Sequence, residues 1–346
     1  MIDYNCIGGK LNRGISVIHC TEAFQTGTAL SPELKEKASI LGWCIEWLRA
    51  GRMVPLSSQG AEQLQAFFLV ADDIMDESTL RRGQPCWFRD PKVKMIAIND
   101  AFLLETFVFQ IIKKHFRSEP FYMQLVEIFH DLGCDFTNCP TEQVIYKTEL
   151  GQLLDLTSQP QDAEPDLARF TPERCWSTTL TSVWYSYRQI VINKTAYYTF
   201  YLSAACAMLL NGVVGESSHE LAKRICIQIG EYFQIQDDFL DCYGDEKVIG
   251  KVGTDIQDNK CSWLVVQALA RASVEQKATL KQHYGRNESA SIAVVKQLYN
   301  ELDLATVYHQ YEDETYAQIS KDIAQVTQMP TGVFTMLVSK IFKRNK

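Results

Sequence analysis

Two short acidic runs are the residues of this chain best suited to chemistry. They read DDIMD from residue 72 to 76 and DDFLD from residue 237 to 241, and each follows an apolar run of helical texture. Side chains four residues apart share one helix face, so the outer aspartates of each run project together. Carboxylates crowded at the end of a core helix repel one another and lose hydration, so a cation must compensate.

Hard oxygen ligands of this kind suit Mg²⁺, which binds carboxylates together with substrate phosphates and water. A solvated acidic surface is the alternative interpretation for one such run, but the repetition favours a metal. The predicted metal-binding residues are Asp72, Asp73, Asp76, Asp237, Asp238 and Asp241.

Basic residues stand at separate places in the chain. Arginine makes bidentate contacts with phosphate and lysine supplies a compact charge, while nearby glycines let the backbone approach an anion. A single lysine is usually a solvated surface charge, but the set as a whole predicts two anionic sites, one bridged by metal and one held by side-chain cations. Its members are Lys10, Arg13, Arg81, Arg82, Lys194, Lys251 and Lys260.

The composition indicates an ordinary globular protein. The chain has 346 residues, 46% of them hydrophobic and 22% charged, and a net charge of −8, which argues against a nucleic-acid partner. Its 11 cysteines show no CxxC pair and no zinc spacing, which is typical of reduced thiols in the cytoplasm. No signal peptide is visible, so we expect a cytoplasmic location, with a removed organelle-targeting segment as the alternative.

The elements that must position these groups are predicted to be mostly helices. Apolar residues recur at spacings of three and four around 102–111, 122–129 and 221–232, which predicts an all-α domain of packed helices. The run 196–215 is nearly long enough to cross a bilayer, but its Tyr, Ser and Asn content favours a buried core helix and no membrane span. Loops are expected at 158–172 and 244–253.

The motifs are similar to those of the farnesyl diphosphate synthase type of short-chain trans-prenyl diphosphate synthases, especially the animal ones. FFLVADDIMDESTLRRGQPCW and GEYFQIQDDFLDCYGDEKVIGKVGTDIQDNKCSW resemble the two aspartate-rich regions, and GGKLNRG, ELGQLLDL, KTAYY and INDAFLLE also match. The resemblance implies one polyprenyl synthetase domain over 1–346, a helical bundle around a central cavity, and a homodimer. It also implies three Mg²⁺ per active site, for which Mn²⁺ can substitute.

The activity implied by the resemblance is the head-to-tail condensation of isopentenyl diphosphate with dimethylallyl or geranyl diphosphate through an allylic carbocation. Each motif carries a role with it. The direct metal ligands would be Asp72, Asp76 and Asp237. The allylic diphosphate would be held by Arg81, Lys194 and Lys251, with Lys260 as a further substrate-binding residue. Isopentenyl diphosphate would be held by Lys10, Arg13, Gln65 and Arg82. The carbocation would be stabilised by Lys194, Thr195 and Gln234.

The resemblance also implies roles for two aromatic residues and for the basic end of the chain. Phe67 and Phe68 stand five and four residues before Asp72, where two rings would floor the pocket and stop growth near fifteen carbons; ordinary aromatic core packing is the alternative. The basic end, 343–346, resembles the family tail that closes over the isopentenyl diphosphate site.

The chain departs from the family pattern in four places. Its start is short, and we expect this to weaken the fold or the dimer. The segments 49–64, 134–145 and 175–186 read as insertions, either retained introns or loops that bulge outward. Pro55 in the first would break a helix at a cost of about 3 kcal/mol. Three alternatives stay open: another short-chain prenyl diphosphate synthase, a terpene synthase that ionises one substrate, and a diphosphate-binding homologue without turnover.

Overall fold

The computed structural model describes residues 1, 4–5, 12–25, 28–45, 64–81, 83–129, 144–157, 187–245 and 253–343. The chain divides into two compact units, each assembled from segments that are far apart in the sequence. The first unit comprises 1–146, 198–224 and 326–336, and the second comprises 147–197, 225–325 and 337–346. The single domain over 1–346 stays a prediction.

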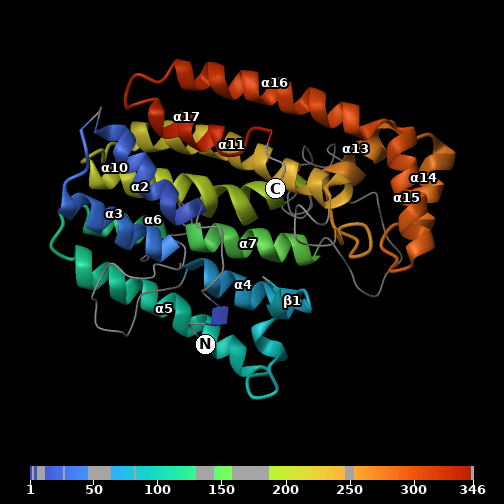
Figure 1. Cartoon of the computed structure of the whole chain (residues 1–346), viewed down its shortest axis with the longest axis horizontal. Coiled ribbons are helices and arrows are strands. Elements are labelled where there is room, and N and C mark those ends of the chain that lie inside the picture. The colour runs from blue at the N-terminus through green and yellow to red at the C-terminus, as the bar shows by residue number, and fades with distance from the viewer. Residues whose placement is uncertain are drawn as a thin grey trace, which may run out of the picture. The chain divides into compact units, whose positions relative to one another are not determined.

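The first unit is a set of packed helices (Figure 1). Among its described residues they are α2 (Asn12–Phe24), α3 (Pro32–Ile45), α4 (Leu64–Met75), α5 (Ile96–Phe116), α6 (Tyr122–Phe129), α10 (Leu202–Leu210) and most of α17 (Gly332–Ser339). Helix α2 packs on α3, α4 packs on α5, and α10 contacts α2, α3 and α6. All of 202–209 is buried, as expected for a core helix. No described helix is long and apolar enough to cross a membrane.

A small hairpin is the exception to the all-α prediction in the described part of the first unit. Strands β1 (Leu80–Arg81) and β2 (Gln84–Pro85) pair antiparallel, with Leu80 opposite Pro85. Gly83 in the turn has φ +77°, a conformation that glycine adopts without steric cost. The hairpin and the 3₁₀ helix Trp87–Arg89 follow α4 directly, so the turn carries the chain back beside the first acidic run.

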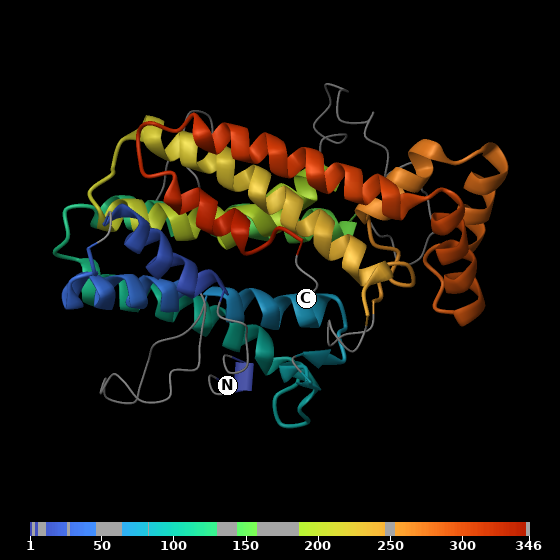
Figure 2. The same cartoon turned by 45° about the horizontal axis from the view of Figure 1, so that its top comes forward.

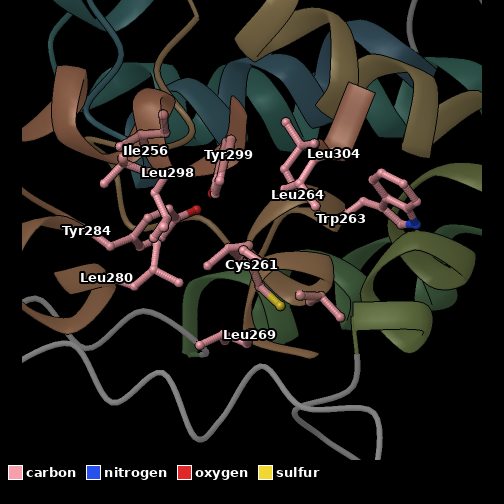
Figure 3. Close-up of a cluster of buried hydrophobic side chains, with 14 of the residues drawn as sticks. Ile256, Cys261, Trp263, Leu264, Leu269, Leu280, Tyr284, Leu298, Tyr299 and Leu304 are labelled. Atoms are coloured by element: carbon pink, nitrogen blue, oxygen red, sulfur yellow. The ribbon is translucent and has the colours of Figure 1, made fainter. Parts of the chain in front are cut away.

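The second unit is also helical. Its described elements are most of α7 (Val144–Thr157), α9 (Tyr187–Val191), most of a π-helix (Ile192–Tyr201), most of α11 (Glu216–Tyr243), α13 (Trp263–Arg271), α14 (Val274–His283), α15 (Ser289–Glu301) and α16 (Leu304–Ala324). Its core gathers buried side chains from most of these helices, among them Trp263, Tyr284 and Leu304 (Figure 3). A Ser273 capping box begins α14.

Helix α16 lies along the part of α11 that belongs to the second unit, as both views show (Figures 1 and 2). The contact is organised by the carboxylate of Glu312, which is buried. Its Oε1 accepts hydrogen bonds from Tyr232 at 2.8 Å, from Tyr308 at 3.0 Å and from Gln236 at 3.3 Å. A buried carboxylate is tolerated only with such donors, so these bonds fix the register of the two helices.

The periodicities predicted helices correctly but did not predict every buried face. The run 122–129 is α6, the run 221–232 lies inside α11, and the run 102–111 lies inside α5. However, Phe102 is 60% exposed and Leu103 is 40% exposed, so part of the apolar pattern of α5 faces away from the core. The predicted insertions fall outside the described residues apart from their edges at 64 and 144–145, and the loop 158–172 is also outside.

Candidate active site

The first acidic run lies at the end of α4, and its three aspartates have different surroundings. Ala66 and Val70 share the buried face of the helix with Asp73, which is 4% exposed, whereas Asp72 and Asp76 are half-buried. Arg81 on β1 donates from Nε to Asp73 Oδ1 at 2.9 Å. It also reaches Asp72 Oδ2 at 3.3 Å.

The arginine and the buried carboxylate are a charged pair. Burial acts to lower the pKa of Arg81, but the hydrogen bond and charge of Asp73, with the charge of Asp72, raise it overall, so the guanidinium keeps its charge. Burial and the same carboxylate raise the pKa of the Cys86 thiol to about 12, so this cysteine stays protonated. Arg81 therefore lies beside the first run with Asp73 as its partner, and its role in holding the allylic diphosphate stays a prediction.

Arg13 on α2 is held by two side chains from a distant segment of the same unit. Its Nε donates to Thr199 Oγ1 at 3.0 Å and its Nη2 to Tyr198 Oη at 3.1 Å, while its guanidinium carbon lies 4.8 Å from the Tyr198 ring centre. The Tyr198 ring also lies 5.9 Å from the ring of Phe68. Sequence reasoning missed Tyr198, although it lies within the KTAYY motif.

The two phenylalanines before the first run pack together. Phe67 is buried and Phe68 half-buried, with ring centres 4.5 Å apart. Phe68 therefore packs near both Phe67 and Tyr198, the tyrosine that binds Arg13. This position is compatible with the predicted role in product length, which stays a prediction.

The second acidic run lies near the end of α11 and repeats the pattern of the first. Asp238, its middle aspartate, is 6% exposed. Its Oδ1 accepts from Gln234 Nε2 at 3.0 Å, and its Oδ2 accepts from Tyr187 Oη at 2.8 Å and from the backbone N–H of Trp263 at 2.7 Å. Burial raises the pKa of Asp238 to about 7, although the three donors act to lower it.

The outer aspartates of this run, Asp237 and Asp241, are half-buried. Asp241 Oδ2 accepts from the N–H of Asp255 at 3.0 Å. A Cβ at residue 253 would lie 1.7 Å from Asp241 O, so the close approach of this loop requires Gly253. Asp73 and Asp238, both predicted as metal-lining residues, are thus engaged by protein donors, whereas the outer aspartates keep partial exposure.

A buried carboxylate joins two of the predicted basic residues in the second unit. Asp155 on α7 accepts at Oδ2 from Lys194 Nζ at 2.6 Å and from Lys260 Nζ at 3.2 Å. Burial would raise the pKa of Asp155, but the two ammonium groups hold it at about 2. Asp155 belongs to the ELGQLLDL match but had no predicted role; an aspartate flanked by Leu154 and Leu156 was the available signal.

The backbones of α7 and the π-helix meet at residue 151. A Cβ there would lie 2.2 Å from the backbone nitrogen of Lys194, so Gly151 allows the contact. The π-helix holds Thr195, whose Oγ1 donates to Gln234 Oε1 at 2.9 Å. π-Helices are rare in proteins, but those that do occur are often found at functional sites. Lys194, Thr195 and Gln234 are thus linked to the Asp155 and Asp238 carboxylates within one unit.

The donor chemistry fits a hard cation that completes its shell with other ligands. Among the described residues, no three carboxylate, imidazole or thiol groups gather closely enough to hold a metal ion by themselves. Mg²⁺ typically takes one or two carboxylates and completes its octahedron with water and phosphate oxygens. The half-buried outer aspartates suit this mode better than a closed protein cage.

Several predicted site residues lie outside the described part of the chain. They are Lys10, Arg82, Lys251 and the basic end 344–346. Gln65 lies in α4, and the structure does not describe its side chain.

Comparisons with known proteins agree with this geometry. The polyprenyl synthetase family model matches residues 57–302. The farnesyl diphosphate synthase of Dictyostelium discoideum is 44% identical over 352 residues, covering 100% of this chain and 81% of the relative. The farnesyl pyrophosphate synthase of Homo sapiens is 45% identical over 347 residues, covering 100% of this chain and 73% of the relative.

Solved structures give the same result. The T. brucei farnesyl diphosphate synthase complexed with risedronate superposes with a TM-score of 0.79 and 35% identity, covering 100% of this chain and 90% of that one. The helical architecture is therefore the prenyl synthase fold that the motifs predicted. By its sequence, its fold and its paired acidic runs, the chain belongs to the polyprenyl synthetase family.

Proposed function

We propose that this chain is a farnesyl diphosphate synthase, a prenyltransferase that joins isopentenyl diphosphate to dimethylallyl and then geranyl diphosphate. The observation that carries the proposal is the repeated arrangement of the acidic runs, each with a buried middle aspartate and half-buried outer ones. Curated relatives from an amoeba, a yeast and a mammal that carry this activity in their names match all of this chain at 43–45% identity.

The proposed metal is Mg²⁺, three ions per active site, with Mn²⁺ as a substitute. Asp72, Asp76 and Asp237 are the proposed direct ligands, because their carboxylates are half-buried and their oxygens are hard donors. When bound, the metal neutralises the diphosphate that leaves the allylic carbon. Asp73 and Asp238 instead position the neighbouring side chains that the reaction uses.

The side-chain cations then hold the allylic diphosphate. Lys194 and Lys260 share the Asp155 carboxylate, which keeps two like charges close together and orients both ammonium groups. Arg81, fixed by Asp73, supplies a third cation. Electrostatic preorganisation of this kind lowers the barrier to C–O cleavage because the cations need not move as charge develops.

The proposed reaction needs no side chain of the protein to remove a proton. The allylic C–O bond breaks with its electron pair on the diphosphate, and the double bond of isopentenyl diphosphate attacks the resulting cation. The released diphosphate accepts the proton that is then lost. Thr195 and Gln234, joined by their 2.9 Å hydrogen bond, are the proposed dipoles beside the cation.

We also propose a homodimer, with the exposed apolar face of α5 as its contact. Ile98, Phe102 and Leu103 on this helix are 45%, 60% and 40% exposed, and contiguous apolar exposure marks interaction surfaces. A Phe102→Glu variant is expected to elute as a monomer in size-exclusion chromatography with light scattering. Val274→Glu is the matched control, since Val274 is an exposed apolar residue on a different helix, α14. A Phe102→Glu protein that stays dimeric would exclude this face.

The function is tested by product analysis with and without isopentenyl diphosphate. A farnesyl diphosphate synthase forms a fifteen-carbon diphosphate only when both substrates are present. A terpene synthase would convert the allylic substrate alone, and a binding homologue would bind a bisphosphonate in the presence of Mg²⁺ without turnover.

A further inference from the structure

The hairpin that carries Arg81 buries little apolar surface of its own. Most of its described residues are exposed, namely Leu80, Gly83, Gln84 and Pro85. Segments with few buried apolar contacts open locally at a low cost in free energy. The position of the hairpin, and with it the position of Arg81, therefore depends on the polar contacts that hold it.

A cavity in the first unit is lined by the hairpin and by α4 together. Its lining includes Leu69 and Val70 of α4, Pro85 of β2, and Tyr4 from the start of the chain. Side chains that line a cavity have no partner atoms on that side and lose the corresponding van der Waals contacts. Apolar packing on α4 is therefore incomplete here, and it does not by itself fix the hairpin.

Tyr4 supplies a polar contact on the strand opposite Arg81. Its Oη donates to the backbone oxygen of Pro85 at 2.6 Å, and Pro85 pairs with Leu80, the residue next to Arg81. The Tyr4 ring lies 5.0 Å from the ring of Trp87, which follows the hairpin. Tyr4 therefore contacts both β2 and the 3₁₀ helix after it.

Trp87 is itself fixed to a long helix of the same unit. Its Nε1 donates to Asp100 Oδ2 on α5 at 2.8 Å. The ring that Tyr4 packs against is thus held in place, which leaves the Tyr4 hydroxyl directed at the Pro85 oxygen. On the other strand, the Arg81 guanidinium reaches Asp73 and Asp72. A misplacement of about 1 Å in a group that acts on a substrate can cost about 100-fold in rate, so the hold on the hairpin matters for Arg81.

We propose that Tyr4 is a positioning residue for Arg81: its hydroxyl holds β2, and the strand pair in turn places the Arg81 guanidinium where it binds the allylic diphosphate. The inference deepens, and rests on, the proposed function, in which Arg81 is one of the diphosphate-binding cations. Tyr4 acts through the hairpin and not by contact with the substrate. Its contribution therefore exists only while Arg81 is present to be positioned.

The first arm of the test measures hydrogen exchange of the hairpin without ligand. Tyr4→Phe keeps the ring beside Trp87 and removes only the hydroxyl. Peptides that contain the Cys86 amide, which bonds to Thr79 O at 3.1 Å across the hairpin, are expected to exchange about threefold faster or more. Tyr146→Phe is the matched control, since it removes an exposed tyrosine hydroxyl on α7 and should leave this exchange unchanged. Unchanged exchange in Tyr4→Phe would overturn the inference.

The second arm is a double-mutant cycle on ligand affinity. Calorimetry in the presence of Mg²⁺ measures binding of an allylic thiolo-diphosphate, which keeps the diphosphate but resists ionisation. Tyr4→Phe is expected to weaken binding about threefold to tenfold in the parent protein and less than about 1.5-fold in an Arg81→Gln background.

The outcomes of the cycle separate the inference from the function on which it rests. A loss of the same size in both backgrounds would show that Tyr4 acts independently of Arg81 and would overturn the inference, as would the absence of any loss in the parent background. In either case the parent protein still binds the analogue, so the proposed function stands. A parent protein that does not bind the analogue overturns the proposed function and the inference with it.

Discussion

Replacing Asp155 by Asn tests the ion cluster of the second unit most directly. In the folded protein the pKa of Asp155 is about 2, against an ordinary value of 3.8, because Lys194 and Lys260 outweigh the effect of burial. Lowering the pKa from 3.8 to about 2 corresponds to roughly 2 kcal/mol of stability. Because the folded pKa is the lower one, this stability is present above about pH 4 and is lost as the pH falls through about 2.

The variant also leaves two ammonium groups without their shared carboxylate. Breaking a buried pair by removing one partner typically costs about 3–5 kcal/mol, more than the titration contribution alone. We expect the free energy of unfolding of Asp155→Asn at pH 7 to be lower than that of the parent protein by about this much. The variant should also lack the part of the parent's loss of stability between pH 4 and 2 that comes from protonation of Asp155.

Urea titration followed by circular dichroism at pH 7, 4 and 2.5 measures both effects. Asp258→Asn, which removes an exposed carboxylate, is the control and should stay within about 0.5 kcal/mol of the parent protein. The ion cluster would be refuted as a source of stability by an Asp155→Asn protein whose free energy of unfolding at pH 7 lies within about 1 kcal/mol of the parent's and falls by the same amount between pH 4 and 2.5.

Three further predictions follow from the packing. Gly151→Ala would place a Cβ 2.2 Å from the backbone of Lys194 and should cost about 3 kcal/mol or more in thermal unfolding; unchanged stability would contradict the backbone contact. Phe68→Ala removes a ring that packs near Phe67 and Tyr198, and should shift the products beyond fifteen carbons in chromatographic analysis, whereas an unchanged product would assign the ring to core packing. Glu312→Leu leaves three buried donors unsatisfied and should lower the free energy of unfolding by about 2 kcal/mol or more, and a neutral result would discount that network.

The fold and the site-bearing motifs were predictable because their signals are local. The helical period of 122–129 predicted α6, and the spacing of Asp72 and Asp76 predicted their common face. The buried position of Asp73 also had a signal, since Ala66, Val70 and Asp73 recur at helical spacing. The same spacing, applied to the acidic run itself, would have distinguished the buried Asp73, which binds Arg81, from the half-buried Asp72 and Asp76.

Other features were not predictable because they depend on contacts between distant segments. Nothing near Asp155 in the sequence indicates that Lys194 and Lys260, 39 and 105 residues away, share its carboxylate. The exposure of Phe102 depends on which face of α5 finds a partner, and periodicity alone does not decide this. The π-helix was likewise not predicted, since π-helices are rare and the spacing of apolar residues does not identify them.

The central claim is tested most directly by supplying the purified protein with Mg²⁺, isopentenyl diphosphate and geranyl diphosphate and identifying the products by chain length. The account predicts a fifteen-carbon diphosphate whose formation requires both substrates and stops when the metal is chelated. Protein shown by circular dichroism to be folded that forms no such product, or that converts geranyl diphosphate equally well without isopentenyl diphosphate, would contradict it.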